Sequence, residues 1–320
     1  MRAHMIPAVA LGATVLGALT LAQPKPRLNP MIGLLQQKKP VFGLYAPSAG
    51  RGARGAAQGT PASAVKTPAD LAAEALAYEA GDILFSGAME RNFENTFPAF
   101  SALAGELAKS PARMKHPLVT KIPKIATDPA KAGDYISRQL NLGVSTIVFV
   151  DIESAEEVQR GLAAMRFKSQ GGTRPEAVGA APAYWGVTEA DYRARADLWP
   201  LDPSGELVNW TIVESREGLA KIREIAAVKG IGALFPGAGT LRGVFTTVNQ
   251  EGQRIFDEAG WEAAIQQVLS ACKEFDVACG YPATEKDIEM RMKQGFSVFI
   301  INWGDAGFRA VDLGRKASGR

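Results

Sequence analysis

The sequence predicts an α/β protein whose core is a (β/α)8 barrel. From about residue 40 onward, eight short apolar runs alternate with eight segments of helical periodicity. The runs are apolar at successive positions, which indicates strands buried on both faces, as in a parallel sheet covered by helices. Eight such units are the number that closes a barrel, and 320 residues with 47% hydrophobic content can bury one. A doubly wound open sheet is the alternative.

The first four predicted strands span 40–46, 82–87, 118–123 and 145–152. Thr67 and Pro68 predict the N-cap and first residue of the first helix, the second helix lies near 97–109, and the third begins after Asp128-Pro129. Ser154 and Glu157 predict a capping box at the start of the fourth. A Gly/Ala-rich stretch at 47–66 is predicted to be a flexible surface loop.

The pattern resumes after a polar, aromatic insertion at 168–205. The remaining strands are predicted at 207–214, 232–237, 277–282 and 297–304, with helices at 215–229, 261–275, 285–295 and at the C-terminus. Residues 39–320 are therefore predicted to form a single barrel domain. The aromatic residues of the insertion either line a pocket or pack the insertion itself: Tyr184, Trp185, Tyr192 and Trp199.

The N-terminal residues are typical of an export signal. Arg2 precedes an apolar run at 5–22, the run ends in Thr20-Leu21-Ala22, and Gln23-Pro24 breaks the pattern. We expect a signal peptide at 1–22, an N-terminal extension at 23–38, and an exported, periplasmic protein with no membrane association after signal removal. An uncleaved membrane anchor is the alternative, but no other stretch approaches the roughly 20 apolar residues that a span needs.

Composition excludes several classes of function. The net charge of +3 arises from 36 basic and 33 acidic residues spread along the chain, so no nucleic-acid partner is expected. His4 and His116 are the only histidines, which leaves no candidate for a Ser-His-Asp triad or a histidine-rich zinc site. Cys272 and Cys279 match no metal or redox motif, and we expect buried thiols.

Polar residues gather where the predicted strands end, which is where a barrel places its active site. They are Tyr45, Glu90, Arg91, Lys121, Asp151, Glu153, Glu214, Tyr281, Asn302 and Asp305. Several carboxylates at one mouth can hold a divalent metal.

Glu214 and Asp151 are the candidate metal ligands, with capping of the following helices as the alternative for each. Glu153 is expected only to cap its helix. Lys121 either binds a substrate carboxylate or carbonyl or is a solvated strand-end lysine, and the Glu90-Arg91 pair either acts in catalysis or is solvated.

The glycines of "ALFPGAGTLRGVF" at 233–245 raise the question of a nucleotide loop. Gly237, Gly239 and Gly243 do not match the dinucleotide fingerprint, because the third glycine is one residue late, and no nucleotide cofactor is expected. We expect a flexible loop whose backbone amides at Gly237 and Gly239, with Arg242, bind an anionic oxygen of the substrate.

Five stretches carry a resemblance to a known family: "VFGLYAPS", "AGDILFSGAMERNF", "TKIPKIATDP", "TIVESREGLAKIREIAAVKGIGALFPGAGTL" and "QGFSVFIINWGD". From about residue 39, the chain resembles the HpcH/HpaI aldolase and citrate lyase family, metal-dependent pyruvate-type aldolases. The resemblance implies a barrel of the phosphoenolpyruvate/pyruvate type and a carbon–carbon lyase that acts on a 2-oxo acid or related hydroxy acid through a metal-stabilised enolate. It further implies a divalent metal (Mg, Mn or Co), a small organic acid as substrate, and a homo-oligomer, a hexamer built as a trimer of dimers that exchange the last helix.

The departures from the family pattern fall on its functional positions. Arg91 stands where the family has its histidine base, two residues after Met89, and Lys121 stands where the family has an arginine that binds pyruvate oxygens. Glu214 matches the first metal ligand of the family, whereas Gly239 stands at the second, an aspartate.

We therefore hypothesise a relocated metal site on Asp151 and Glu214, to which Glu90 is a candidate third contributor, with Glu90, Arg91 and Lys121 as the catalytic side chains. An exported, non-catalytic binding protein for a small oxo or sugar acid on the same barrel is the alternative function.

Overall fold

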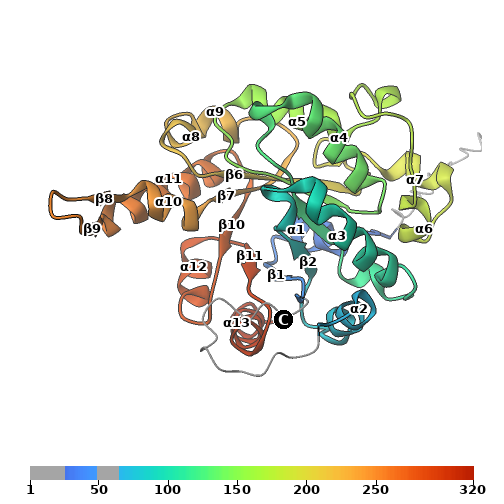
Figure 1. Ribbon diagram of the computed structural model, residues 1–320, viewed down its shortest axis with the longest axis horizontal. Coiled ribbons are helices and arrows are strands. Elements are labelled where there is room, and N and C mark those ends of the chain that lie inside the picture. The colour runs from blue at the N-terminus through green and yellow to red at the C-terminus, as the bar shows by residue number, and fades with distance from the viewer. Residues whose placement is uncertain (1–25, 49–64) are drawn as a thin grey trace, which may run out of the picture.

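The computed structural model describes residues 26–48 and 65–320, so the predicted signal at 1–22 and most of the predicted flexible loop lie outside the described residues. Eight parallel strands close into a barrel in the order β1–β2–β3–β4–β6–β7–β10–β11 (Figure 1). Pairing of β11 with β1 and of β4 with β6 completes the ring. The predicted barrel is confirmed, and the open sheet is excluded. The barrel strands are β1 (Val41–Tyr45), β2 (Ile83–Ser86), β3 (Leu118–Lys121), β4 (Thr146–Phe149), β6 (Leu207–Val213), β7 (Ile231–Pro236), β10 (Ala278–Pro282) and β11 (Val298–Ile301).

Helices follow the strands around the outside of the barrel. They are α2 (Pro68–Ala77), α3 (Phe93–Leu107), α4 (Pro129–Leu140), α5 (Ala155–Met165), α8 (Arg216–Ala220), α9 (Ile222–Ala226), α11 (Glu258–Glu274), α12 (Ile288–Gln294) and α13 (Asp305–Ala317). Short 3-10 helices occupy Ala88–Glu90, Arg113–Lys115, Ile125–Thr127 and Lys168–Gln170. The single helix predicted at 215–229 is thus divided into α8 and α9.

The predicted helix starts are largely confirmed. The Thr67 side chain accepts from the Asp70 N–H and forms a capping box with Asp70. The predicted box at α5 is only half formed. The Ser154 hydroxyl accepts from the Glu157 N–H at 3.2 Å, but the Glu157 carboxylate accepts from the backbone N–H groups of Glu153 and Ala126 instead of returning to Ser154.

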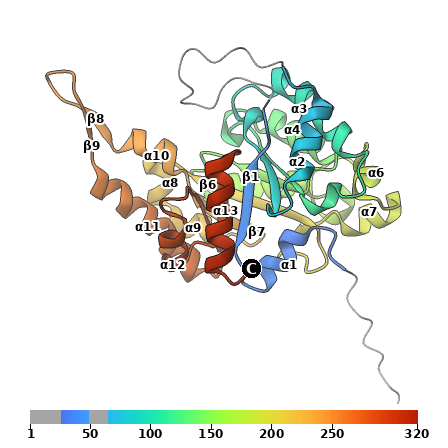
Figure 2. The ribbon, with the colours of Figure 1, turned by 90° about the horizontal axis from the view of Figure 1, so that it is seen from below.

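A short helix closes the N-terminal end of the barrel. α1 (Pro30–Gln36) lies within the predicted N-terminal extension, beneath the start of β1 (Figure 2). Its buried Met31 and Ile32 pack with the interior strand residues Val41 and Val298. Hydrophobic side chains therefore plug this end, and a substrate has to enter from the other.

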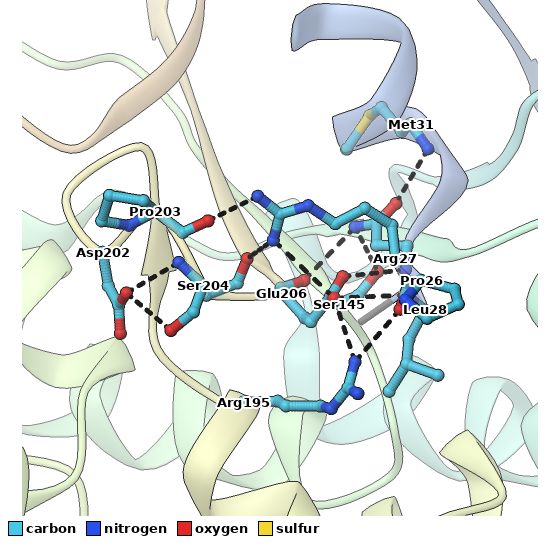
Figure 3. Close-up of polar contacts among 12 residues, drawn as sticks. Pro26, Arg27, Leu28, Met31, Ser145, Arg195, Asp202, Pro203, Ser204 and Glu206 are labelled. Atoms are coloured by element: carbon cyan, nitrogen blue, oxygen red, sulfur yellow. Dashed lines mark hydrogen bonds and ion pairs between the residues drawn. The ribbon is translucent and has the colours of Figure 1, made fainter. Parts of the chain in front are cut away.

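The segment before α1 is anchored to the insertion (Figure 3). The carboxylate of Glu206 accepts from the backbone N–H groups of Leu28 at 3.2 Å and Asn29 at 3.0 Å. Arg27 and Arg195 form ion pairs with the same carboxylate at 3.7 and 3.5 Å. Burial nevertheless raises the pKa of the Glu206 carboxyl, and these contacts offset part of that effect. This cluster fixes the path of the chain into α1.

The insertion contains α6 (Ala181–Trp185), α7 (Glu189–Arg195) and β5 (Leu198–Trp199), which pairs with β6. Tyr184, Trp185 and Tyr192 are buried in the hydrophobic core, so packing is the role that the structure gives them. Trp199 packs near the N-terminal end of the barrel, beside Leu35 of α1.

The segment after β7 differs from the flexible loop that was predicted. It forms the helix α10 (Ala238–Val244), with Leu241 fully buried. An antiparallel hairpin of β8 (Thr246–Val248) and β9 (Arg254–Phe256) follows and projects away from the barrel (Figures 1 and 2).

The expectation of buried thiols was wrong. Cys272 of α11 and Cys279 of β10 are both buried, and they form a disulfide with their Cα atoms 5.6 Å apart. The chain reverses direction between the end of α11 and the start of β10, which brings the two residues together. In the described ranges, we find no helix of the length and apolarity that crossing a membrane requires.

Candidate active site

A cavity of about 230 Å³ opens at the C-terminal ends of the barrel strands. Its floor is apolar and is formed by Phe85, Trp210, Phe235 and Ile300, while Lys121 is the only cation among the described residues that line it. A larger cavity of about 500 Å³ lies near the N-terminal end, beside the disulfide. We place the site at the smaller cavity, because the C-terminal end of a barrel carries the catalytic residues and the predicted polar groups converge there.

Lys121 ends β3 and enters the cavity from the strand. The alternation of side chains along a strand turns Val119 and Lys121 to the same side, and Val119 packs in the barrel interior. The Lys121 ammonium nitrogen lies 2.8 Å from Oε2 of Glu90, and the lysine side chain is only 15% exposed. The structure thus brings two of the three predicted catalytic residues together. The third, Arg91, is exposed and does not line the cavity.

Glu214 follows β6 and is nearly fully buried. Its Oε1 accepts from the backbone N–H of Asp151 at 3.1 Å. Burial raises the pKa of the Glu214 carboxyl. A hydrogen bond from Thr240 and the charge of Lys121 offset part of this rise, whereas the charges of Glu90 and Asp151 add to it. A carboxyl in this environment takes up a proton more readily than a solvated one.

Gly237 is what allows Glu214 to occupy this position. A Cβ added to Gly237 would lie 2.3 Å from Cβ of Glu214 and 2.5 Å from its Oε2. Gly239, further into α10, has no atom within 4 Å of an added Cβ, so open space surrounds the position where the family has an aspartate. Arg242 lies outside the cavity, with its guanidinium 3.8 Å from the ring centroid of Phe256 in β9.

Asp151 pairs with a lysine. Its Oδ2 lies 2.8 Å from Nζ of Lys124, which also lies 2.7 Å from Oε2 of Glu153. Burial works to lower the pKa of Lys124, but its hydrogen bonds to the two carboxylates prevail and hold that pKa above its usual value. The hydrogen bond from Lys124 to Glu153 lowers the pKa of the Glu153 carboxyl. The expectation that Glu153 caps its helix was wrong, because its carboxylate pairs with Lys124 and Ser154 is the N-cap of α5. Asp151 has a φ of 50°, a left-handed conformation that concentrates at functional sites.

The arrangement of donors does not fit a divalent metal. Cations such as Mg²⁺ need several oxygen ligands in a regular geometry. No group of three or more His, Cys, Asp or Glu side chains in the described part of the chain is arranged to hold one. The Asp151 carboxylate is taken up by Lys124, and the Glu214 carboxylate accepts from Asp151 and Thr240. A metal would therefore have to compete with Lys124 for Oδ2 of Asp151 and with neutral donors for Glu214.

Sequence reasoning missed Trp210 and Thr240. Trp210 is 1% exposed and lines the cavity, and its indole Nε1 is buried without a hydrogen-bond partner in the described structure. A buried donor without an acceptor is costly, which favours a ligand oxygen at that point. The spacing of the residues could have identified Trp210, because Trp210, Ile212 and Glu214 occupy every second position at the end of β6, which places them on one face, and all three line the cavity.

The other predicted strand-end residues lie apart from the cavity, except for Tyr45, which lines it. Tyr281 faces the helical layer, where its hydroxyl accepts from Arg291. Asn302 and Asp305 are exposed, and His116 is buried directly before β3, at the opposite end of that strand from Lys121.

Comparison with known proteins identifies relatives along most of the chain. Residues 108–308 match the model of the HpcH/HpaI aldolase/citrate lyase family. A hydroxypyruvate/pyruvate aldolase from Paraburkholderia phytofirmans is 25% identical over 285 residues, which cover 89% of this chain and 90% of the relative.

Solved structures show the same fold. An HpcH/HpaI aldolase/citrate lyase family protein from Burkholderia cenocepacia superimposes with a TM-score of 0.64 at 21% identity, over 90% of this chain and 97% of that one. The citrate lyase beta subunit from M. tuberculosis, solved with oxaloacetate and magnesium, has a TM-score of 0.52 at 14% identity, over 90% of this chain and all of the other (100%).

Proposed function

The chain belongs to the HpcH/HpaI aldolase/citrate lyase family and is an aldolase-type carbon–carbon lyase, and we propose that its substrate is a small 2-oxo acid or a related hydroxy acid. The observation that carries the proposal is the cavity at the mouth of the barrel. It combines an apolar floor with a single lysine that is paired to a glutamate and partly withdrawn from water. A volume of about 230 Å³ suits an acid of a few carbon atoms.

Three groups are placed to bind the oxygens of such an acid. Lys121 supplies the positive charge. The indole N–H of Trp210 is an unused donor in the wall of the cavity. The first residues of α10, from Ala238 to Thr240, line the cavity as well, and N–H groups in the first turn of a helix have no acceptor within the helix. Gly239 lies in this first turn, whereas the Gly237 N–H donates to the carbonyl of Val213 at 2.8 Å, so of the two predicted backbone donors only Gly239 is offered to the substrate.

Breaking a carbon–carbon bond next to the carbonyl leaves an electron pair that has to be stabilised by a nearby cation. The solved citrate lyase subunit was crystallised with magnesium. In this chain the expectation of Mg, Mn or Co on Glu214 and Asp151 stays a prediction that the arrangement of donors does not support. Metal analysis of the purified protein tests it, together with Asp151→Ala, which abolishes metal binding if Asp151 is a ligand.

The activity is tested by a retro-aldol screen of 4-hydroxy-2-oxo acids with pyruvate detection, run with and without EDTA. We expect release of pyruvate from at least one of them. Stabilisation of the protein by pyruvate without turnover of any substrate would refute the lyase and support the alternative, an exported binding protein for a small oxo or sugar acid.

We further propose that the protein acts in the periplasm as a homo-oligomer. The disulfide between Cys272 and Cys279 supports an oxidising compartment. Cell fractionation and thiol titration of the native protein test the location, with a free thiol in the isolated protein as the contrary result. Light scattering on the purified protein tests the oligomer, and we expect a hexamer.

A further inference from the structure

We infer that the substrate carries a hydrocarbon substituent beyond its 2-oxo acid group, and that this substituent lies against an apolar half of the cavity, formed by Tyr45, Phe85, Pro282 and Ile300. The inference rests on the proposed function and specifies the class of aldehyde that leaves when the carbon–carbon bond breaks. That aldehyde is apolar and carries no second acid group.

The lining of the cavity is divided between the two halves of the barrel. The polar groups lie on the half made by β3, β4, β6 and β7: Lys121 ends β3, Glu214 follows β6, and the first turn of α10 follows β7. The other half is made by β10, β11, β1 and β2, which lie side by side (Figure 1). Each of these four strands contributes one side chain of the apolar half to the cavity.

Strand geometry turns these side chains into the barrel. Phe85 is the second residue after Ile83, which packs in the barrel interior, and side chains two positions apart on a strand point the same way. Tyr45 is the partner of Phe85 across β1 and β2, and Pro282 is the partner of Ile300 across β10 and β11. The apolar half is therefore fixed by the strand register and does not depend on a loop.

The aromatic rings form one continuous surface along the cavity. The ring centroid of Phe85 lies 4.8 Å from that of Tyr45 and 6.5 Å from that of Trp210, and Trp210 lies 5.1 Å from Phe235. Phe85 is 3% exposed and Tyr45 is 37% exposed, so the surface runs from the closed floor to the mouth. Rings that contact one another in this way are held in place, and a hydrocarbon group that covers them releases water from a preformed apolar wall.

The distribution of charge orients the substrate. Lys121 is the one cation among the described cavity-lining residues, and it is placed to bind the acid group together with the N–H groups at the start of α10. Arg91 and Arg242 lie outside the cavity. A second carboxylate on the substrate would therefore meet the apolar half, where no described lining residue carries a positive charge, and an ion that loses water without gaining a partner is strongly disfavoured.

Two pairs of acids test the inference on the purified full-length protein. 4-Hydroxy-2-oxoheptanoate and 4-hydroxy-2-oxoheptanedioate have the same carbon chain, which ends in a methyl group in the first and in a carboxylate in the second. We expect kcat/KM for pyruvate release to be at least roughly 10-fold higher for the monoacid. 2-Oxoheptanoate and 2-oxoheptanedioate lack the 4-hydroxyl and cannot undergo retro-aldol cleavage, so calorimetric titration with them measures binding alone, and we expect Kd to follow the same order.

Substitutions at Tyr45 test where the substituent lies. Tyr45→Arg places a cation in the apolar half, and we expect the ratio of kcat/KM for the diacid to that for the monoacid to rise at least roughly 10-fold. Tyr45→Phe keeps the ring and should keep the preference of the wild type. Met290→Arg adds the same charge on α12, at a residue that is 44% exposed and outside the cavity, and should leave the ratio unchanged.

The outcomes separate the inference from the proposed function. Cleavage of the diacid as fast as the monoacid, or release of pyruvate only from acids with polar substituents, overturns the inference and leaves the lyase in place. A folded Tyr45→Arg protein with the wild-type preference overturns it as well, and if circular dichroism shows that this variant is unfolded, the two pairs of acids decide on the wild type alone. Tighter binding of 2-oxoheptanoate without any pyruvate release refutes the lyase and keeps the apolar half as a binding surface. Absence of both binding and turnover removes the inference and the proposed function together.

Discussion

Replacement of Gly237 by alanine tests how closely the start of α10 approaches Glu214. The φ of Gly237 is −73°, which any residue adopts, so the substitution acts through space and not through backbone strain. Carbon atoms in contact are normally about 3.5–4.0 Å apart. The added Cβ would lie 2.3 Å from Cβ of Glu214, so either Glu214 or α10 has to move.

The expected cost follows from two effects. Overpacking of a tight interior costs about 1–3 kcal/mol. If Glu214 moves away, the hydrogen bond of its Oε1 with the Asp151 N–H is lengthened, and a hydrogen bond to a charged group contributes about 1.5–3 kcal/mol. The two costs are not additive, because the movement of Glu214 that relieves the steric clash is the same movement that lengthens its hydrogen bond with the Asp151 N–H. We expect Gly237→Ala to lower the free energy of unfolding by about 2–4 kcal/mol.

Gly239→Ala is the matched control on the same helix. No atom lies within 4 Å of its added Cβ, and alanine is favoured over glycine in helices by up to about 1 kcal/mol. Urea unfolding of the two variants and the wild type, with pyruvate release assayed in parallel, measures the contrast. If Gly237→Ala matches Gly239→Ala in stability and turnover, the close approach of Glu214 has no energetic consequence and our reasoning is refuted.

The remaining predictions concern the same cavity. Burial raises the pKa of Glu214, so the stabilisation associated with its protonated form is complete below about pH 4, the ordinary pKa of Glu, and is lost as pH rises through the higher folded-state pKa. Glu214→Gln should therefore gain stability relative to the wild type as pH rises. A difference in urea midpoints that does not change with pH would contradict this. Gly239→Asp has room for its side chain and restores the carboxylate that the family has at this position, so this variant should bind Mn²⁺ more tightly than the wild type in an EPR titration. Equal affinities would show that the introduced carboxylate does not reach the site. Trp210→Phe removes the unpaired indole N–H. The free energy of unfolding should therefore change by no more than about 1 kcal/mol, while KM for the substrate rises about 2- to 10-fold. An unchanged KM would mean that the indole does not contact the substrate.

The course of the chain through the barrel was predictable because it depends on local patterns. Eight buried runs separated by helical segments allow few arrangements, and parallel strands with right-handed crossovers close in chain order. Elements outside this alternation of strands and helices were missed, among them α1, α10 and the β8–β9 hairpin.

The candidate site was predictable as a set of strand ends but not as a set of contacts. The sequence placed Lys121, Glu90 and Glu214 at one mouth. It paired Asp151 with Glu214 as metal ligands, whereas the structure pairs the Asp151 carboxylate with Lys124, a residue that sequence analysis did not single out. Which acid meets which lysine depends on side-chain rotamers and on the path of a loop beyond the strand, and neither has a signature in residue spacing.

The barrel, the end of it that carries the polar residues, and the lysine at that end could all be predicted from the residues alone, because hydrophobic periodicity and strand order are local properties that tertiary packing preserves. Three features became visible only in the folded chain: the disulfide between Cys272 and Cys279, the unused donor of Trp210, and the pairing of lysines with Glu90 and Asp151. Those facts depend on distances between segments far apart in the chain, which are set by the closure of the barrel and by how its helices pack around it.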